Sequence, residues 1–166
     1  GCGNVGNAVA MILLNRAYCT VELNVMEPSE SQQGRLLELS HIAGLHQIHS
    51  YSHNDLNEFA QADVVFHTAG RCMQANERRL DVAEENLKLT RQIFNQVTFT
   101  KQPLILVLTN PVDVITYFVR EQTQLPNHKV IGAGTLLDSA RFSAVLQNSG
   151  VTQNHAPAWV IGEHGD

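Results

Sequence analysis

The chain has 166 residues, 43% of them hydrophobic, and its 11 Lys and Arg stand against 16 Asp and Glu for a formal net charge of −5. This length suits a single domain, with a core large enough to need neither a metal nor disulfides for stability. The acidic balance, with no long basic run, argues against nucleic acid or an anionic membrane surface as a partner.

Helix-length and strand-length patterns alternate along the whole chain. In chain order, we expect a helix at 7–17, a strand at 21–26, a helix at 29–40, a weak strand at 47–51, a strand at 63–67, a helix at 79–97, a strand at 104–108, a helix at 112–124, a strand at 130–132, a helix at 136–148 and a strand at 159–161. Ser29 and Gln32 form a capping-box pattern at the start of the second helix. This alternation predicts an α/β fold with a doubly wound, mostly parallel sheet.

A glycine-rich motif opens the chain. Gly1-Cys2-Gly3-Asn4-Val5-Gly6 matches G-x-G-x-x-G and leads into the first expected helix, whose N-terminal N–H groups could bind a pyrophosphate. Glu27 follows Gly6 at the end of the next expected strand, where a carboxylate can accept hydrogen bonds from both ribose hydroxyls and repel a 2′-phosphate. The pair predicts NAD rather than NADP; the alternatives are a chance glycine-rich end and a solvated Glu27 in a turn.

Three downstream segments carry a family resemblance. They are Thr109-Asn110-Pro111-Val112-Asp113, Gly134-Thr135-Leu136-Leu137-Asp138-Ser139-Ala140-Arg141-Phe142 and Gly162-Glu163-His164-Gly165-Asp166. In this order and spacing, together with Gly34, the 38–41 helix end and Thr68-Ala69-Gly70, they resemble the lactate/malate dehydrogenase family.

The resemblance implies a domain organisation. Residues 1–166 would form the Rossmann-like NAD-binding domain of an oxidoreductase that acts on a small 2-hydroxy or 2-oxo acid, as a homo-dimer or homo-tetramer. The first strand, in the middle of the sheet, and the C-terminal substrate domain would then lie outside these residues. We therefore expect residues 1–166 alone to bind NAD weakly at best and to turn over no substrate.

The resemblance also assigns roles to single residues. Asp138 and Arg141 are three positions apart and share a helix face. Arg141 would bind the substrate carboxylate through a two-pronged hydrogen bond, Asp138 would hold His164, and His164 would exchange a proton with the substrate hydroxyl. The alternatives are an ordinary surface ion pair and a histidine in a flexible tail.

Two strand ends complete the expected site. Asn110 would hydrogen-bond the substrate oxygen or the nicotinamide ribose, and Pro111 would turn the chain, with a cis peptide bond as an option. Thr68, Ala69 and Gly70 follow a strand at the sheet edge where ligands bind in open α/β folds, so we expect them to contact the cofactor.

The loop after Gly70 departs from the family pattern. Arg79 takes the place of the arginine that polarises the substrate carbonyl, although Arg78 beside it is an alternative, and Asn76 replaces a glycine. Met73 stands where the family distinguishes its substrates and predicts a preference for an apolar side chain on the 2-oxo acid. The rival is that Arg71 binds a dicarboxylate, which would make the enzyme specific for malate and oxaloacetate.

Other kinds of site and function have weaker support. Four histidines between 41 and 53 have no metal-ligand spacing, so we expect no metal. Three cysteines without C-x-x-C spacing indicate a reducing cytoplasm. No apolar run is long enough to span a bilayer, and the opening Gly1-Cys2-Gly3 has no basic segment or start methionine of the kind that a signal peptide has. The competing function class is a dinucleotide-binding scaffold without catalysis.

Overall fold

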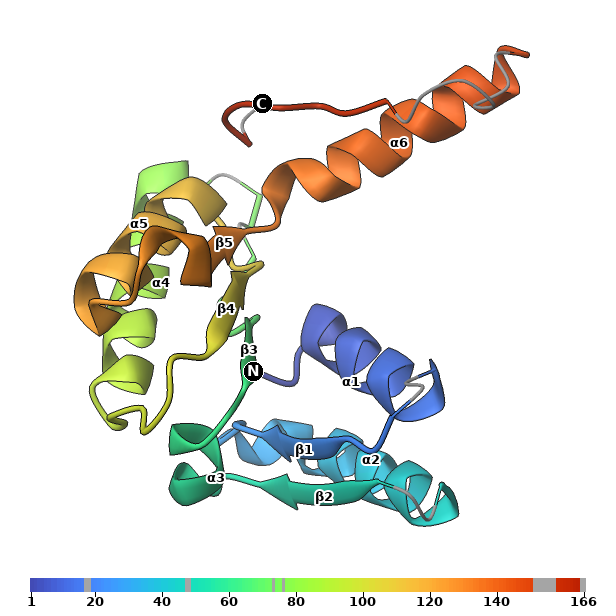
Figure 1. Cartoon of the computed structure of the whole chain (residues 1–166). Helices are drawn as coiled ribbons and strands as arrows, with labels where there is room; N and C mark the ends of the chain where they lie inside the picture. Colours follow the sequence, from blue (N-terminus) through green and yellow to red (C-terminus); the bar gives the residue numbers. More distant parts are fainter. Residues whose placement is uncertain (17–18, 47–48, 73, 76, 151–157, 165–166) are drawn as a thin grey trace.

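Helices and strands alternate along the chain in the computed structural model, which describes residues 1–166 except 17–18, 47–48, 73, 76, 151–157 and 165–166 (Figure 1). The element order is α1 (Asn4–Arg16), β1 (Glu22–Val25), η1 (Glu30–Gln32), α2 (Gln33–Leu45), β2 (Ser50–His53), α3 (Leu56–Ala60), β3 (Val64–His67), α4 (Arg79–Phe94), β4 (Leu104–Val107), α5 (Val112–Thr123), η2 (Asn127–Lys129), β5 (Val130–Gly132) and α6 (Gly134–Asn148). The predicted α/β class is confirmed.

All of the strand pairs in the described residues are parallel. β1 pairs with β2, with Leu23 opposite Tyr51, and β3, β4 and β5 form a second sheet in that order. Parallel strands joined by helices bring their carboxyl ends to one edge, where ligands bind in this class of fold. The ends of β3, β4 and β5 therefore present residues 68–70, 108–110 and 133–134 side by side.

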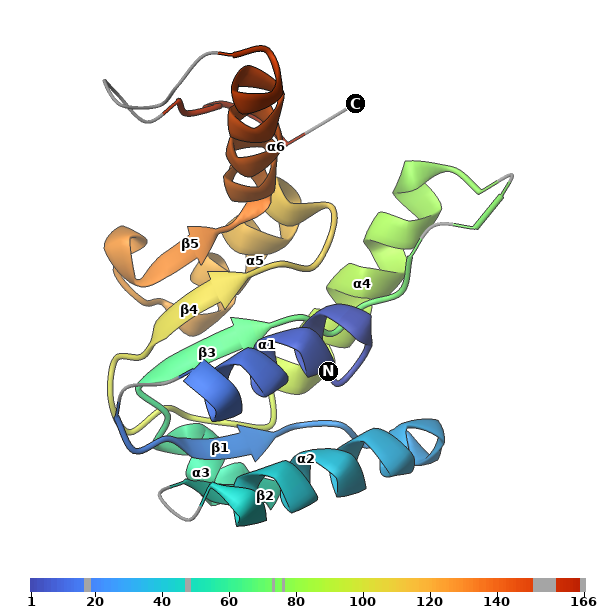
Figure 2. The ribbon, with the colours of Figure 1, turned by 90° about the vertical axis from the view of Figure 1, so that its right-hand side faces the viewer.

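A cavity of about 810 Å³ lies between the two sheets. It is lined by residues of β1, β3, α1 and α3, and α1 crosses in front of the space between β1 and β3 in Figure 2. No backbone ladder joins β1 to β3 in the described part of the chain.

Two apolar clusters hold the two sheets to their helices. One surrounds β4, where Ile105 and Val107 are fully buried against Ile115 and Val119 of α5. The other joins α1, β1 and α2 through residues that include Leu14 and Leu39, which are 1% and 0% exposed. Burying aliphatic side chains of this size removes apolar surface from water and is the main stabilising contribution to each half.

The region around Ser29 differs from the prediction. Ser29 makes no side-chain cap, because its hydroxyl lies 2.8 Å from the Ser31 hydroxyl and the chain first turns through η1. The expected capping box with Gln32 is therefore wrong. α2 starts at Gln33 and continues to Leu45, beyond the expected end at 40, and its buried stripe extends from Leu36 to Ala43.

Two further elements differ from the sequence prediction. α3 was not expected; Asp55 caps it by accepting hydrogen bonds from the N–H groups of Asn57 and Glu58. The strand expected at 159–161 is absent, since the described residues there form no ladder and the Val160 N–H donates to the Ser139 hydroxyl of α6 instead. No helix in the described ranges is both long and apolar enough to cross a membrane.

Candidate active site

The glycine loop runs into the N-terminus of α1 and lines a cavity of about 750 Å³. Gly6 must be glycine here, because a Cβ would lie 2.0 Å from the Gly1 carbonyl oxygen and 2.7 Å from the Thr68 hydroxyl. A Cβ at Gly3 would meet nothing within 4 Å, so the loop presents an open face there. The close turn and the free helix N-terminus are the features that a pyrophosphate requires.

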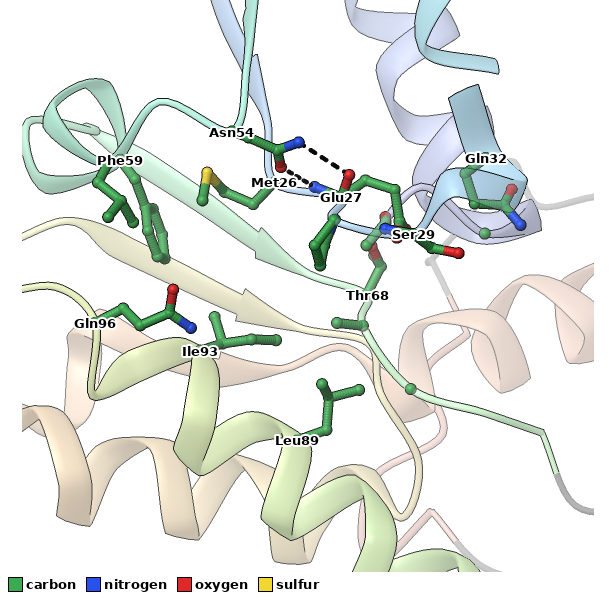
Figure 3. Close-up of a pocket in the computed structure, with 16 residues that line it drawn as sticks. Met26, Glu27, Ser29, Gln32, Asn54, Phe59, Thr68, Leu89, Ile93 and Gln96 are labelled. Carbon is green, nitrogen blue, oxygen red and sulfur yellow. Dashed lines mark hydrogen bonds between the residues drawn. The ribbon is translucent and has the colours of Figure 1, made fainter. Parts of the chain in front are cut away.

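Glu27 follows β1 and lies against the same loop. Its carboxylate accepts hydrogen bonds from the Cys2 N–H at 2.6 Å and from the Ser29 N–H at 3.1 Å. Each carboxylate oxygen can accept more than one hydrogen bond, so the group keeps acceptor capacity for a ligand. Glu27 lines the cavity, as Figure 3 shows, and its backbone is held by the side chain of Asn54.

Arg35 of α2 contacts the other side of the glycine loop. Its guanidinium donates to the Cys2 carbonyl oxygen at 3.1 Å and to the Asn4 side-chain oxygen at 2.8 Å. The sequence pattern did not indicate Arg35 or Asn54, because Arg35 reaches the glycine loop, and Asn54 reaches Glu27, across more than 25 residues of sequence. Val5, the remaining loop position, is exposed in the first turn of α1.

The end of β3 forms the opposite wall of the cavity. The Thr68 hydroxyl donates to the Gly1 carbonyl oxygen at 2.8 Å, and a Cβ on Gly1 would lie 2.7 Å from the Ala69 Cα. A Cβ on Gly70 would lie 2.6 Å from the Thr109 side chain. The structure thus brings the glycine loop, Glu27 and residues 68–70 to one cavity, with Leu89 and Ile93 of α4 adding apolar surface (Figure 3).

Asn110 follows β4 at the same edge and is exposed. Its bond to Pro111 is cis, which was one of the expected options, and α5 begins directly afterwards. The Asn110 carbonyl oxygen accepts a hydrogen bond of 2.7 Å from the side chain of Asn86, a buried residue of α4. Asn86 was not among the predicted site residues.

An acid–base cluster lies beyond β5 at the start of α6. His164 Nδ1 is 2.8 Å from Asp138 Oδ2, and Arg141 Nη1 is 3.3 Å from Asp138 Oδ1. The His164 N–H donates to the Asp113 carboxylate at 2.9 Å, which fixes the histidine backbone over the start of α5. A Cβ on Gly134 would lie 2.6 Å from the His164 Cβ, so this glycine permits the close approach. Asp113 is the contact that the sequence pattern did not predict.

The loop after Gly70 carries a network of ion pairs. Arg71 Nη1 is 2.6 Å from Glu77 Oε2, and the Arg71 Nε also binds Glu85 of α4. The hydrogen bonds to Arg71 lower the pKa of both carboxyl groups. Arg78 pairs with Asp81 at 2.9 Å, and Arg79 is the first residue of α4. The Arg79 side chain, Met73 and Asn76 lie outside the described part of the structure.

A buried histidine stands behind the β3 end. His67 is 4% exposed, its Nε2 lies 2.9 Å from the Thr90 hydroxyl, and its ring meets Phe94 edge-on. Burial lowers the pKa of His67 to about 4. His67 is therefore neutral at physiological pH and belongs to the packed interior.

No group of three or more His, Cys, Asp and Glu side chains in the described ranges is arranged to hold a metal. Of the histidines between 41 and 53, His49 accepts the Val21 N–H through its Nδ1, and His46 lies against Asn15. All three cysteines are free; Cys2 is buried, and Cys19 and Cys72 are exposed.

The parallel strands, the glycine turn at a helix N-terminus, the carboxylate after β1 and the histidine–aspartate pair at one sheet edge define a dinucleotide-binding domain of the dehydrogenase type. Residues 1–132 match the family described as lactate/malate dehydrogenase, NAD binding domain, and the chain belongs to that family.

Similar proteins extend the match over the whole chain. The chain is 37% identical over 169 residues to an L-lactate dehydrogenase of Deinococcus radiodurans and 33% identical over 168 residues to one of Fervidobacterium nodosum; the alignments cover 100% of the chain and 55% and 54% of those proteins. A solved malate dehydrogenase from Archaeoglobus fulgidus in complex with NADH superposes with a TM-score of 0.87 at 30% identity, over 100% of this chain and 57% of that one. The chain thus spans about half the length of these relatives.

Proposed function

We propose that the chain is the cofactor-binding part of an NAD-dependent dehydrogenase that interconverts a small 2-hydroxy acid and the corresponding 2-oxo acid. The observation that carries this proposal is the 2.8 Å contact between His164 and Asp138, beside Arg141. This cluster follows β5, two strands away from the β3 end that lines the dinucleotide cavity.

The cavity offers the pyrophosphate and the adenosine part of NAD chemically suitable partners. The N–H groups at the start of α1 suit the pyrophosphate, and Glu27 suits the ribose hydroxyls of adenosine. Leu89 and Ile93 provide an apolar wall for a flat base. The negative charge of Glu27 disfavours the additional phosphate of NADP.

The acid–base cluster supplies the proton transfer. With Nδ1 held by Asp138, His164 has Nε2 available to take the proton of the substrate hydroxyl, and to return it in the reverse direction. Bound NAD would supply the hydride chemistry at the substrate carbon that bears this hydroxyl. Arg141 holds the substrate carboxylate through its planar fork, Asn110 binds the substrate oxygen, and Arg79 polarises the carbonyl.

The substrate side chain that we propose is apolar, as in pyruvate or a branched analogue, because Met73 provides neither a charge nor a strong hydrogen bond. The contacts of Arg71 support this choice over a dicarboxylate. Its guanidinium binds Glu77 through Nη1 and Glu85 through Nε, so these two carboxylates would compete with a second substrate carboxylate for Arg71. We further propose a cytoplasmic homo-dimer or homo-tetramer, by analogy with the family.

The test is NADH oxidation by the full-length protein with pyruvate, a branched 2-oxo acid and oxaloacetate. We expect His164→Ala to lower the rate on the order of 10²- to 10⁴-fold, as expected on losing a general acid–base group. His128→Ala, at an exposed histidine of η2, is the matched control and should leave the rate unchanged. Oxaloacetate as the best substrate would contradict the apolar preference. NADH binding without reduction of any 2-oxo acid would instead support the scaffold function.

A further inference from the structure

Asn86 has a buried side-chain amide whose hydrogen bonds are all to residues outside its own helix. It lies in the middle of α4 and is 2% exposed. Its Oδ1 accepts the Arg71 N–H at 3.0 Å, while its Nδ2 donates to the Arg71 carbonyl oxygen at 3.2 Å and to the Asn110 carbonyl oxygen at 2.7 Å. One side chain thus binds the first residue of the loop after Gly70 and the residue at the end of β4.

The neighbouring polar residue of α4 behaves differently. Thr90 is fully buried one turn further on, donates to the Asn86 carbonyl oxygen of its own helix and contacts His67 of β3. Thr90 therefore satisfies groups within the helix and the sheet. Burying an amide is unfavourable unless its donors and acceptor are all paired, and an apolar side chain could fill the same space without that cost.

We propose that Asn86 is a positioning residue for the proposed dehydrogenase reaction: it fixes the base of the loop that leads into Arg79, the first residue of α4, at a set distance from Asn110. The inference rests on the proposed function for its catalytic meaning. The packing around the amide supports it, since a Cβ on Gly70 would lie 3.1 Å from Asn86 Oδ1 and 2.6 Å from the Thr109 side chain. The loop base is thus held between the amide and the β4 end.

The chemistry of the site requires asparagine. The two segments present one N–H donor and two carbonyl acceptors, and a side-chain amide offers the complementary acceptor and two donors on one plane. Aspartate has the same size but, when ionised, is an acceptor only and would face both carbonyl oxygens with a negative charge. Protonation of such a carboxyl would restore one donor, so Asn86→Asp carries its own pH signature.

The experiment compares Asn86→Ala, Asn86→Asp and the control Thr90→Val in the full-length protein. Misplacing a catalytic loop by about 1 Å can cost on the order of 100-fold, so we expect kcat/KM for the 2-oxo acid to fall about 10- to 100-fold in both Asn86 variants. The Kd for NADH should change less than about threefold, because the dinucleotide cavity is unchanged. Thr90→Val should lower the Tm comparably yet retain kcat/KM within about threefold. In Asn86→Asp, activity relative to the wild type should recover as the pH falls.

Amide hydrogen exchange tests the hydrogen bond between Asn86 and the Arg71 N–H without an activity assay. The Arg71 amide should be protected in the wild type and in Thr90→Val but exchange faster in Asn86→Ala, because its acceptor is gone. Equal exchange in all three proteins, or equal kcat/KM in the Asn86 and Thr90 variants, would overturn the inference. A wild type that reduces no 2-oxo acid would refute the proposed function alone, and the exchange result would still decide whether Asn86 fixes the loop. Should Asn86→Ala not fold, Asn86→Asp provides the kcat/KM comparison, and Asn86→Leu, which lacks the acceptor, provides the exchange comparison.

Discussion

The buried His67 should make folding stability depend on pH between about 6.5 and about 4. Its ring packs edge-on against Phe94, with 5.4 Å between the ring centroids, and only 4% of the residue is exposed. Burial is the main cause that lowers its pKa from 6.5 to about 4. A histidine in an unfolded chain has no such environment and titrates near its ordinary value.

The direction of the effect follows from which state binds the proton first. As the pH falls below about 6.5, the unfolded chain protonates this histidine while the folded chain keeps it neutral until about pH 4. The stability that the neutral ring contributes is therefore complete above pH 6.5 and is lost as the pH falls toward 4. At about 1.4 kcal/mol per pH unit, the whole loss is about 3 kcal/mol, of which about 2 kcal/mol has occurred by pH 5.

Urea unfolding followed by far-UV circular dichroism between pH 8 and pH 5 measures this loss. The variant His67→Gln keeps a donor for the Thr90 hydroxyl but does not titrate, so the wild type should lose about 2 kcal/mol more than the variant. His53→Gln, at an exposed position of β2, should behave as the wild type does. The carboxyl groups with lowered pKa, such as Glu77, are present in all three proteins and cancel. A wild-type curve parallel to that of His67→Gln would refute the reasoning.

Three other substitutions have clear expected outcomes. Ile105→Ala, at a fully buried side chain of β4, should lower the free energy of unfolding by about 2–5 kcal/mol in urea titrations. Its control, Ile131→Ala, at a 44% exposed side chain of β5, should change that free energy by about 0.5 kcal/mol or less. Gly6→Ala should weaken NADH binding, measured by fluorescence titration, at least about tenfold because the added Cβ cannot fit, while Gly34→Ala, with nothing within 4 Å, should bind NADH normally. Glu27→Gln should raise the affinity for NADPH relative to NADH, and an unchanged ratio would contradict its role in cofactor choice.

Strong local patterns made most of the fold predictable. The apolar run that includes Ile105 and Val107 can be buried only as an interior strand, and β4 occupies that place. Trp159 and Ile161 form a similar apolar pattern but are 64% and 88% exposed, and the Val160 N–H between them bonds the Ser139 hydroxyl of α6 instead of a neighbouring strand. The failure at Ser29 has a local cause, since its hydroxyl bonds a nearby serine instead of the helix N–H groups.

The candidate site also contains some residues that the sequence predicted and others that it did not. Residues inside compact motifs, such as Asp138 and Arg141, lie on one helical face, as their spacing predicted; they also form the ion pair that was the alternative interpretation. Asn86 and Arg35 act across 15 or more residues through side-chain contacts with backbone groups, and no local pattern encodes such contacts. Predicting them requires the packing of α4 and α2 against the loops.

The division between the two sheets bears directly on cofactor binding. One wall of the cavity comes from the glycine loop and Glu27, and the other comes from residues 68–70 and α4. The described contacts between these walls include the hydrogen bond from Thr68 to the Gly1 carbonyl oxygen, the approach of Gly1 to Ala69 and of Gly6 to Thr68, and the packing of Met26 against the apolar cluster around β4, while β1 and β3 share no ladder.

A wall held without a shared ladder must be ordered when the ligand binds, and that ordering reduces the affinity. We therefore predict that residues 1–166 alone bind NADH more weakly than the full-length protein and reduce no 2-oxo acid. A control with residues 1–166 carrying Thr68→Val, which removes the hydroxyl donor, should bind still more weakly. Calorimetry with NADH measures both differences, and turnover by residues 1–166 alone would contradict the prediction.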